Sequence, residues 1–488
     1  MKRQHSYRSA AVFAGVLALV FPVSAGFGVS SVFVPAGEAW ASTSVNATIF
    51  RSSSLCSRGD IQYISYYDAE GWLVLGRRVI SSGEPFTTRR TPYRGNVRDA
   101  HNSISMAVDG DGYLHVSFDH HGAPLKYARS VAPDALELGP LEPMTGSGEG
   151  NVTYPEFHRL ADGGLVFVFR DGMSGSGNLV MNRYSTKERR WTRLHDSLID
   201  GEGRQNPYWQ MCTDPAGAIH LSWVWRRTPD VATNHDLCYA RSRDGGVSWE
   251  RTDGTPYALP ITAATAEYAL RIPERSELIN QTGMAADAAS HPAIATYWRE
   301  KGDKAVQYRL VRHDGKGWRV LRLPERTLDF RLAGGGTKAI PVSRPRIVTD
   351  GNFAAVLFRD AERGSRASAY VTDDIDSGDW RTVDFSKEPL GAWEPSIDDD
   401  LWRERRHLHL YFQPVRQGDG ERSLDGAPTK AGALEVRWRQ IGRVVAGEDR
   451  DPVRGLPRPV RIPSVLSQGG RPHSSYGMCV LFCTREGM

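Results

Sequence analysis

Cysteine is scarce in this chain of 488 residues, which contains only five. They are Cys56, Cys212, Cys238, Cys479 and Cys483. So few cysteines in a long chain exclude a disulfide scaffold as the basis of the fold. One bridge, such as Cys479 to Cys483 or Cys212 to Cys238, is permitted in an oxidising compartment.

Long apolar runs are missing beyond the first forty residues, and no later segment approaches the roughly 20 apolar residues of a membrane helix. The N-terminus carries Lys2 and Arg3, then an apolar run from Ala10 to Pro35, then Ala39-Trp40-Ala41. This is the layout of a secretory signal peptide. We expect residues 1–41 to be such a peptide, cleaved after Ala41. The mature protein should be secreted, soluble and free of membrane spans.

An excess of one charge sign is also missing. The chain has 57 acidic and 61 basic residues, a formal net charge of +4, and the basic residues are dispersed. No strong field therefore favours nucleic acid as a partner. A preference for an acidic ligand must come from a local arrangement of side chains.

Stretches with a helical period are few, and a strand repeat stands in their place. Each repeat joins a turn with Asp or Gly to a short strand that ends in an aromatic residue. The six copies are VDGDGYLHVSFDHH from Val108, LADGGLVFVFRD from Leu160, TDPAGAIHLSWVWR from Thr213, ADAASHPAIATYWRE from Ala286, VTDGNFAAVLFRD from Val348 and DDLWRERRHLHLYFQ from Asp399. Seven further hairpins, several with a Trp in the second strand, alternate with these copies.

This alternation predicts an all-β fold, a seven-bladed β-propeller of four-stranded antiparallel blades. We expect it to span residues 42–442 as one domain, with the first and last segments completing one blade together. Residues 443–488 are rich in Pro, Gly and Arg, lack the repeat and are predicted to form a loosely ordered tail. Ser242 to Trp249, SRDGGVSW, fits an Asp-box turn, for which we expect a structural role.

Aligning the blades identifies candidate site residues, because equivalent positions form rings around a propeller's axis. The blades are aligned on the last aromatic residue of the second strand in each repeat. Side chains alternate between the two faces of a strand, so His121, Arg170 and Arg226, which follow this aromatic, should point the same way in three neighbouring blades. Arg299 and Arg359 occupy the same ring, although pairing with nearby acids is the alternative there. A second ring, where the first strands begin, holds His101-Asn102, Tyr154, Tyr208, Asn280, Arg344 and Glu394.

The two rings predict a cluster across blades two to four that contains His101, His121, Tyr154, Arg170, Tyr208 and Arg226. His120 competes with His121 for the site, and strand parity favours His121. Three other histidines, His115, His220 and His409, share one mid-strand position in different blades, which indicates a packing role.

Two histidines, a tyrosine and an arginine without a pair of carboxylates suit proton abstraction beside a carboxylate better than glycoside hydrolysis. In a uronic acid the C5 proton is weakly acidic, and an Arg that neutralises the carboxylate stabilises the enolate-like transition state. His can act as base and Tyr as acid or base. The chemistry is β-elimination, and it needs no organic cofactor.

The segments DAHNSISMAVDGDGYLHVSFDHH and NVTYPEFHRLADGGLVFVFRDG resemble the BNR-repeat family of secreted seven-bladed propeller lyases, which includes ulvan lyases and rhamnose-glucuronate lyases. The likeness runs from about Ser54 to Gln440. It implies a polysaccharide lyase that cleaves a bond to glucuronate or iduronate next to rhamnose. His101, His121, Tyr154 and Arg170 match the family's catalytic residues. Substrate contacts are expected from Asn102, Tyr208, Arg226, Arg299 and Arg359.

Family members can hold a structural metal, and two sets of residues offer ligands for one. Cys212, His235 and Cys238 could bind Zn²⁺, with a disulfide or buried thiols as the alternative. The run Asp398-Asp399-Asp400 could attract Ca²⁺, with a solvated turn as the alternative. The expected partner is a uronate-containing polysaccharide or oligosaccharide, and the protein is expected to be a monomer.

Two other functions compete with the lyase. A sialidase-like hydrolase is suggested by the Asp-box, the ring arginines and Arg271-Ile272-Pro273, but a single good Asp-box is present. A carbohydrate-binding propeller without catalysis is the third hypothesis, because a fold does not determine function.

Overall fold

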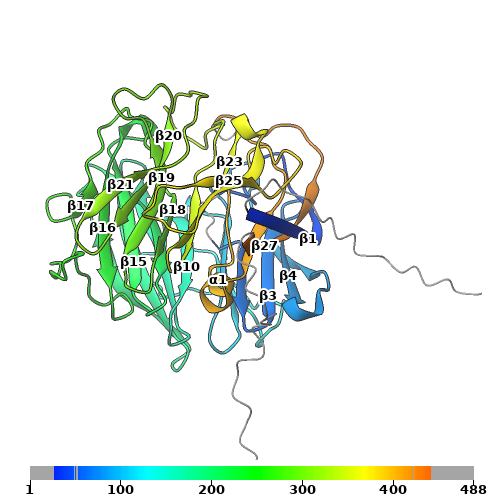
Figure 1. Ribbon diagram of the computed structural model, residues 1–488. Coiled ribbons are helices and arrows are strands. Elements are labelled where there is room, and N and C mark those ends of the chain that lie inside the picture. Colours follow the sequence, from blue (N-terminus) through cyan, green and yellow to red (C-terminus); the bar gives the residue numbers. More distant parts are fainter. Residues whose placement is uncertain (1–26, 49, 51–52, 421, 441–488) are drawn as a thin grey trace, which may run out of the picture. The chain divides into compact units, whose positions relative to one another are not determined.

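The computed structural model describes residues 27–48, 50, 53–420 and 422–440 (Figure 1). By its internal contacts the chain divides into one unit that ends at Ile441 and a second unit, Gly442–Met488. The second unit, and with it the predicted tail 443–488, lies outside the described residues. The described residues of the first unit form seven small sheets.

The first four sheets follow one another along the chain. The first contains β2 (Leu55–Arg58), β3 (Ile61–Tyr67), β4 (Trp72–Val79) and β5 (Thr87–Arg94). The second contains β6 (Ile104–Val108), β7 (Leu114–Phe118) and β9 (Tyr127–Arg129). The third contains β8 (His121–Ala123), β10 (Val152–Arg159), β11 (Leu165–Met173), β12 (Ser176–Ser185) and β13 (Arg190–Ile199). The fourth contains β14 (Asn206–Thr213), β15 (Ile219–Arg226), β16 (Asn234–Ser242) and β17 (Glu267–Leu270).

Three sheets complete the ring. The fifth contains β18 (Gly283–Ala286), β19 (Pro292–Trp298), β20 (Gln307–His313) and β21 (Trp318–Arg322). The sixth contains β22 (Arg346–Asp350), β23 (Phe353–Asp360), β24 (Arg366–Thr372) and β25 (Arg381–Asp384). The seventh contains β26 (Leu408–Phe412), β27 (Thr429–Gln440) and β1 (Phe27–Ala39). The helical segments are α1 (Asp399–Arg405) and the 3₁₀ turns η2 (Ile80–Ser82), η3 (Val231–Thr233) and η4 (Ala361–Arg363).

The predicted all-β fold, a propeller of seven antiparallel blades, is confirmed. Two blades have three full strands. In the second blade an isolated bridge between Ser130 and Leu138 marks the place of the outer strand. In the seventh a bridge between Ile397 and Leu410 marks the inner one.

The repeated turn has a common physical cause. Asp109 Oδ1 accepts hydrogen bonds from the backbone N–H groups of Asp111 and Tyr113, each 2.9 Å long. Asp214 does the same for Ala216 and Ala218 in the fourth blade. An Asp that bonds the backbone two and four residues on closes the turn between the two inner strands.

The same turns anchor the repeated histidines. His115 bonds the Tyr127 hydroxyl at 2.8 Å and Asp109 at 3.2 Å. His220 repeats this with Tyr239 at 2.7 Å and Asp214 at 3.0 Å. His409 is also buried. The predicted packing role of these three histidines is confirmed.

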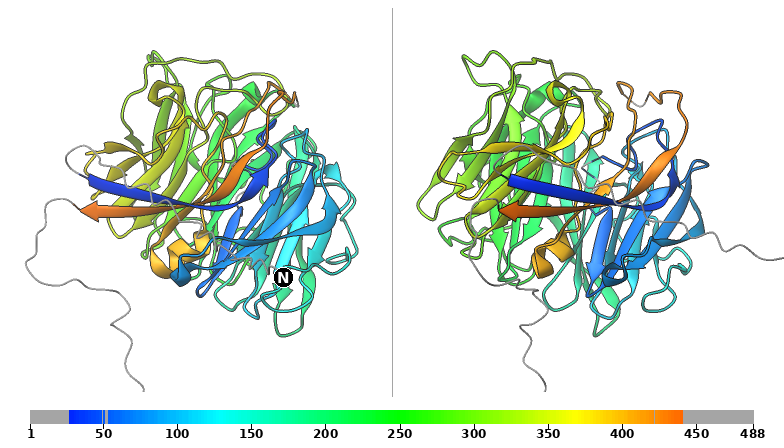
Figure 2. Two further views of the ribbon diagram at one scale, coloured as in Figure 1. Left: turned by 90° about the vertical axis from the view of Figure 1, so that its right-hand side faces the viewer. Right: turned by 45° about the vertical axis from the view of Figure 1, so that its right-hand side comes forward.

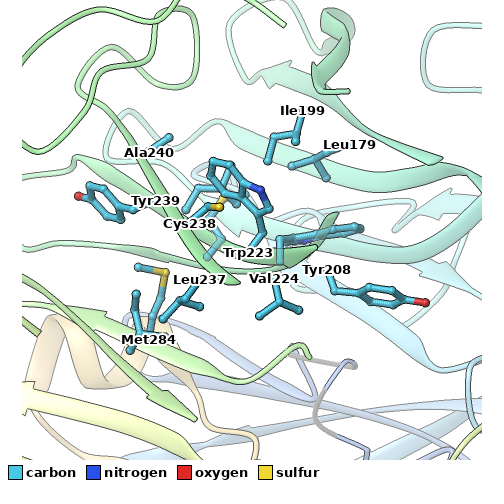
Figure 3. Close-up of a cluster of buried hydrophobic side chains, with 14 of the residues drawn as sticks. Leu179, Ile199, Tyr208, Trp223, Val224, Leu237, Cys238, Tyr239, Ala240 and Met284 are labelled. Carbon is cyan, nitrogen blue, oxygen red and sulfur yellow. The ribbon is translucent and has the colours of Figure 1, made fainter. Parts of the chain in front are cut away.

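Apolar side chains fill the space between blades. Trp223 of β15 pairs with Cys238 of β16, and both lie in one buried cluster with Met284 of β18 in the next blade (Figure 3). All eight residues of β15 are buried, because a middle strand is covered on both faces by neighbouring blades. The Asp-box adds a local clasp: Asp244 accepts from Val247 and Ser248, and Trp249 is buried.

The seventh blade joins the two ends of the described chain. β1 pairs with β27 from Phe27↔Gln440 to Ala39↔Thr429, and the two strands lie side by side in both views of Figure 2. The predicted sharing of a blade by the first and last segments is therefore confirmed. The predicted cleavage after Ala41 is at odds with this pairing, because it would remove β1. A leader must end before Phe27 for the blade to keep this strand.

The innermost strands of successive blades pack around the propeller axis, and α1 lies beside the ends of several of them. A cavity of about 90 Å³ there is lined by the ends of inner strands and by α1. The acidic run at this helix does not form a calcium site. Asp398 caps α1 through Leu401 N, Asp399 pairs with Arg346, and Asp400 pairs with Arg159 and Arg403. These carboxylates are committed to the helix cap and to arginines, so the Ca²⁺ prediction is corrected.

Candidate active site

A second pocket, of about 210 Å³, opens at the opposite ends of the inner strands, where β10 and β14 begin. Tyr154 lies near the start of β10 and Tyr208 near the start of β14. The pocket lining contains all six residues of the predicted cluster: His101, His121, Tyr154, Arg170, Tyr208 and Arg226. The two rings read from the repeats thus meet at one mouth of the propeller.

One carboxylate holds both histidines. Asp99 Oδ1 lies 2.6 Å from His101 Nδ1, and Asp99 Oδ2 lies 2.6 Å from His121 Nδ1. The two imidazole rings are stacked with centroids 4.1 Å apart, and Phe50 stacks on the other face of His101 at 5.3 Å. Burial disfavours the charge on Asp99, but the hydrogen bonds and charges of the histidines outweigh it and hold the carboxyl's pKa well below its usual range.

His121 rather than His120 lines the pocket. His120 is buried, accepts a hydrogen bond from Lys126 N at 2.8 Å, and burial lowers its pKa to about 3. The alternation of side chains along one strand, on which the prediction rested, does not explain why His121 reaches the pocket, because the strand ends before this residue. β7 ends at Phe118, Asp119 takes a left-handed conformation with φ of 65°, and His121 begins β8 in the third blade.

Tyr154 occupies a strained position in the middle of the pocket. Its φ of 56° lies in the left-handed region, at an irregularity in the pairing of β10 with β11. Its ring lies 5.8 Å from His101 and 5.7 Å from Tyr208, measured between centroids. Burial, with Tyr208 beside it, raises the pKa of Tyr154 well above its usual value. This phenol therefore stays protonated at neutral pH.

Tyr208 has the opposite character. Its hydroxyl oxygen accepts from Arg226 Nη1 at 3.0 Å and from Arg170 Nη1 at 3.2 Å, and it lies 2.9 Å from Ser174 Oγ. The Arg226 guanidinium also lies over the Tyr208 ring, 4.2 Å from its centroid. Burial alone would raise the pKa of this phenol, but the charges of Arg226 and Arg170 outweigh burial and lower it to about 8.

The two arginines are buried beside Tyr208, and neighbouring side chains hold Arg226 in place. Arg226 Nε donates to Asn234 at 2.8 Å and its Nη2 to Asn280 at 2.6 Å. Arg170 is buried, and its Nε has no hydrogen-bond partner among the described residues. Two nearly buried guanidiniums on one tyrosine hydroxyl form a site that a carboxylate would occupy with better charge balance.

Further pocket residues stand outside the predicted cluster. Arg344 and Lys338 add positive charge to the lining, which also contains Phe50, Ser174 and Asn280. Arg344 pairs with Glu394 at 2.8 Å and donates from Nε to the Asn280 carbonyl at 3.0 Å. Asn280, Arg344 and Glu394 stood in the second ring, so their positions carried a signal. Asp99 carried none beyond its place two residues before His101.

Three predicted substrate contacts lie outside this pocket and are corrected. Asn102 donates to the Asn96 carbonyl and accepts from the Tyr67 hydroxyl through its own carbonyl. Arg299 forms ion pairs with Glu277 and Asp329. The Arg359 guanidinium donates to the main-chain carbonyls of Ile340, Pro341, Val342 and Trp393. Each of these side chains is engaged by partners within the fold instead.

The predicted zinc ligands do not come together. Cys212 pairs with His220 and Cys238 pairs with Trp223, so the cysteines lie two strands and about 10 Å of strand length apart. Both are free thiols, which excludes the Cys212–Cys238 bridge, and His235 Nδ1 bonds the Thr233 carbonyl. The pair Cys479 and Cys483 lies outside the described residues.

Asp99, His101 and His121 are the one cluster of metal-ligand types found in the described part of the chain. Two ligands of a tetrahedral Zn²⁺ with bonds of about 2.0 Å are roughly 3.3 Å apart. The Nδ1–Oδ distances of 2.6 Å are those of hydrogen bonds. We therefore treat this cluster as a hydrogen-bonded triad.

The fold and the pocket together define a class: a seven-bladed β-propeller with a pocket of histidines, tyrosines and arginines at one end of its inner strands. The chain belongs to the BNR repeat-containing family, whose sequence profile matches residues 61–326.

Curated relatives of this chain include ulvan lyases. The long isoform from Alteromonas sp is 28% identical over 248 residues, which cover 39% of this chain and 24% of the relative. The long isoform from Pseudoalteromonas sp. (strain PLSV) is 25% identical over 293 residues, 47% of this chain and 28% of the relative. The chain thus matches about a quarter of the length of these relatives.

Solved structures of lyases share the fold. The polysaccharide lyase Uly1 superposes with a TM-score of 0.59 at 15% identity, covering 79% of this chain and 89% of that chain. A PL25 ulvan lyase bound to -[GlcA(1-4)Rha3S]- superposes with a TM-score of 0.58 at 16% identity, covering 82% of this chain and 94% of that chain.

In the described residues, no helix is long and apolar enough to cross a membrane.

Proposed function

We propose that this protein is a polysaccharide lyase that cleaves a glycosidic bond to a uronic acid by β-elimination. The observation that carries the proposal is the arrangement of Arg170 and Arg226 beside two tyrosines and a stacked histidine pair in one pocket. The names of the curated relatives support the same reaction class.

The arginines bind the uronate carboxylate in this proposal. The carboxylate replaces the Tyr208 hydroxyl as the acceptor for Arg170 and Arg226. When the C5 proton leaves, negative charge moves onto the carboxylate, and two guanidiniums already fixed there stabilise it. Their buried setting makes this stabilisation larger than it would be in water.

Proton transfer falls to the histidines and tyrosines. A neutral imidazole of the stacked pair accepts the C5 proton through Nε2. The electron pair of the C5–H bond forms the C4–C5 double bond, and the C4–O bond breaks. Tyr154, which stays protonated, donates its proton to the departing glycosidic oxygen. The products are an unsaturated uronate and a new hydroxyl end, and the balance requires no organic cofactor.

The substrate we propose is a glycan in which glucuronate or iduronate adjoins rhamnose, as in ulvan or gum arabic. Support comes from the relatives named ulvan lyase and from the disaccharide unit bound in the PL25 structure. We further propose that the protein acts outside the cell as a monomer. The basic start and apolar run of residues 1–26 support export.

Incubation with ulvan, gum arabic and other uronate glycans tests the proposal. Wild-type protein should generate the ultraviolet absorbance of a conjugated unsaturated uronate. Arg170→Ala should lower kcat/KM by at least about 100-fold, because it removes a buried donor to the developing charge. Arg299→Ala is the matched control. Arg299 lies outside the pocket, so the activity of this variant should stay close to that of wild type.

The other outcomes separate the competing hypotheses. New reducing ends without the absorbance would indicate a hydrolase, and binding without products would indicate a carbohydrate-binding propeller. Full eliminating activity in Arg170→Ala would refute the site assignment.

A further inference from the structure

We propose that Asp99 is a positioning residue that fixes both site histidines in one tautomer, with the proton on Nδ1 and the lone pair on Nε2. The catalytic consequence rests on the proposed function, whereas the tautomer itself does not. No family resemblance or sequence pattern assigned a role to this residue.

The geometry of the triad carries the inference. An ionised carboxylate is a pure acceptor, so each imidazole nitrogen 2.6 Å from it must be a donor. Each histidine therefore keeps a proton on Nδ1, and in the neutral ring Nε2 becomes the acceptor. The low pKa of Asp99 agrees with a carboxylate that stays ionised throughout the working range.

The rings cannot easily turn away from this arrangement. Phe50, His101 and His121 form a continuous stack, with centroid separations of 5.3 Å and 4.1 Å and interplanar angles of 16°. Asp99 is itself fixed, because its Oδ1 also accepts from the His101 backbone N–H at 2.9 Å. The residue thus sets the tautomer of two side chains that come from different blades.

The same contacts predict an asymmetric response to substitution. In Asp99→Asn the amide oxygen should stay where two donors meet, at His101 N and Nδ1. The amide NH₂ group, which only donates, then faces His121 Nδ1. His121 can accept from it only with its own proton on Nε2. The substitution should therefore switch the tautomer of His121 and leave that of His101 unchanged.

Nitrogen-15 spectra of histidine-labelled full-length protein test this directly. At about pH 9, where an ordinary imidazole is neutral, the shifts of Nδ1 and Nε2 distinguish the two tautomers. His101→Gln and His121→Gln serve to assign the signals. Wild type should show both site histidines protonated on Nδ1, and Asp99→Asn should show His121 protonated on Nε2.

The matched control is Asp287→Asn, which alters another Asp–His pair, Asp287 with His291, far along the chain in the fifth blade. It should leave the signals of His101 and His121 in place. A wild-type spectrum with either site histidine protonated on Nε2 would overturn the proposal, even if Asp99→Asn fails to fold. So would an unchanged His121 tautomer in a folded Asp99→Asn variant.

The catalytic consequence has its own readout. On a glycan that wild type cleaves, Asp99→Asn should lower kcat by about 100-fold, the range of one general base, with KM nearly unchanged. If wild type cleaves no uronate glycan, the proposed function fails while the tautomer result still stands. If the spectra behave as expected but kcat does not fall, Asp99 is structural and the positioning role is wrong.

Discussion

Tyr208 shows how a single side chain can report the occupancy of the site. Its phenol is buried between two guanidiniums, which lower its pKa to about 8 in the free protein. Above that pH it becomes a phenolate and occupies both arginines. In the proposed function a substrate carboxylate needs the same two groups, so ionised Tyr208 and a bound uronate would exclude one another.

The pH dependence follows from this competition. We expect kcat/KM on a uronate glycan to fall as the pH rises through about 8, because kcat/KM reports ionisations of the free enzyme. Tyr208→Phe should abolish that fall. Initial rates at low substrate from about pH 6 to 10 measure it. A rise in kcat/KM through the same pH would mean instead that the Tyr208 phenolate is the catalytic base.

The sequence could select His101, His121, Tyr154 and Arg170 because strand position and blade order determine which residues reach the axis. It could not show that Arg299 and Arg359 turn away, since their partners come from distant segments. A buried arginine and a ligand-binding arginine look alike in a strand pattern. Asp99 escaped notice for a related reason: one of its two histidine partners lies in another blade.

At the scale of elements, β1 was hidden by the composition that suggested a leader. The segment FGVSSVFVP is apolar enough for a signal peptide, yet it is also rich in the β-branched and aromatic residues that favour a strand. Val29 and Val34 are buried against the seventh blade, and Ser31 Oγ donates to the Phe385 carbonyl. Only the pairing with a strand about 400 residues later, as in Val29↔Trp438, distinguishes a strand from a signal peptide here.

Removing β1 should destabilise the propeller. Burial of two valines contributes about 3–6 kcal/mol before backbone hydrogen bonds are counted. A chain that begins at Ser42 should therefore melt at least about 5 °C below one that begins at Gly26. Thermal unfolding of the two proteins measures this. Equal melting temperatures would contradict the assignment of β1 to the blade.

Helix α1 carries a second testable feature at its cap. Burial, reinforced by Asp400, raises the pKa of Asp398 from its usual 3.8 to about 6. The folded state therefore binds this proton more tightly than the unfolded chain does. The resulting stability is complete below about pH 4 and is lost as the pH rises through about 6, by roughly 3 kcal/mol.

Asp398→Asn should remove that dependence, because Asn caps a helix and carries no charge. Urea unfolding at about pH 4 and pH 7 compares the two proteins. The free energy of unfolding of wild type, relative to the variant, should be lower at pH 7. A relative free energy that is the same at both pH values would show that Asp398 is not protonated in the fold.

On the scale of the whole molecule, the two ends of the inner strands differ in what surrounds them. At one end, inner strands and α1, whose Asp399 pairs with Arg346, enclose a small cavity. At the other end, successive blades bring two histidines, two tyrosines and several arginine and lysine side chains into one pocket. The net charge of +4 is spread over the chain, so in the proposed function the attraction for an acidic glycan comes from this pocket rather than from the surface field.

The mass of the products formed from a uronate glycan tests the central claim most directly. Elimination leaves a new non-reducing end that is lighter by one water than the corresponding hydrolysis product. We predict such an end from wild type and from Arg299→Ala, and its near absence from Arg170→Ala. Products that have gained water, or undiminished elimination by Arg170→Ala, would contradict the account.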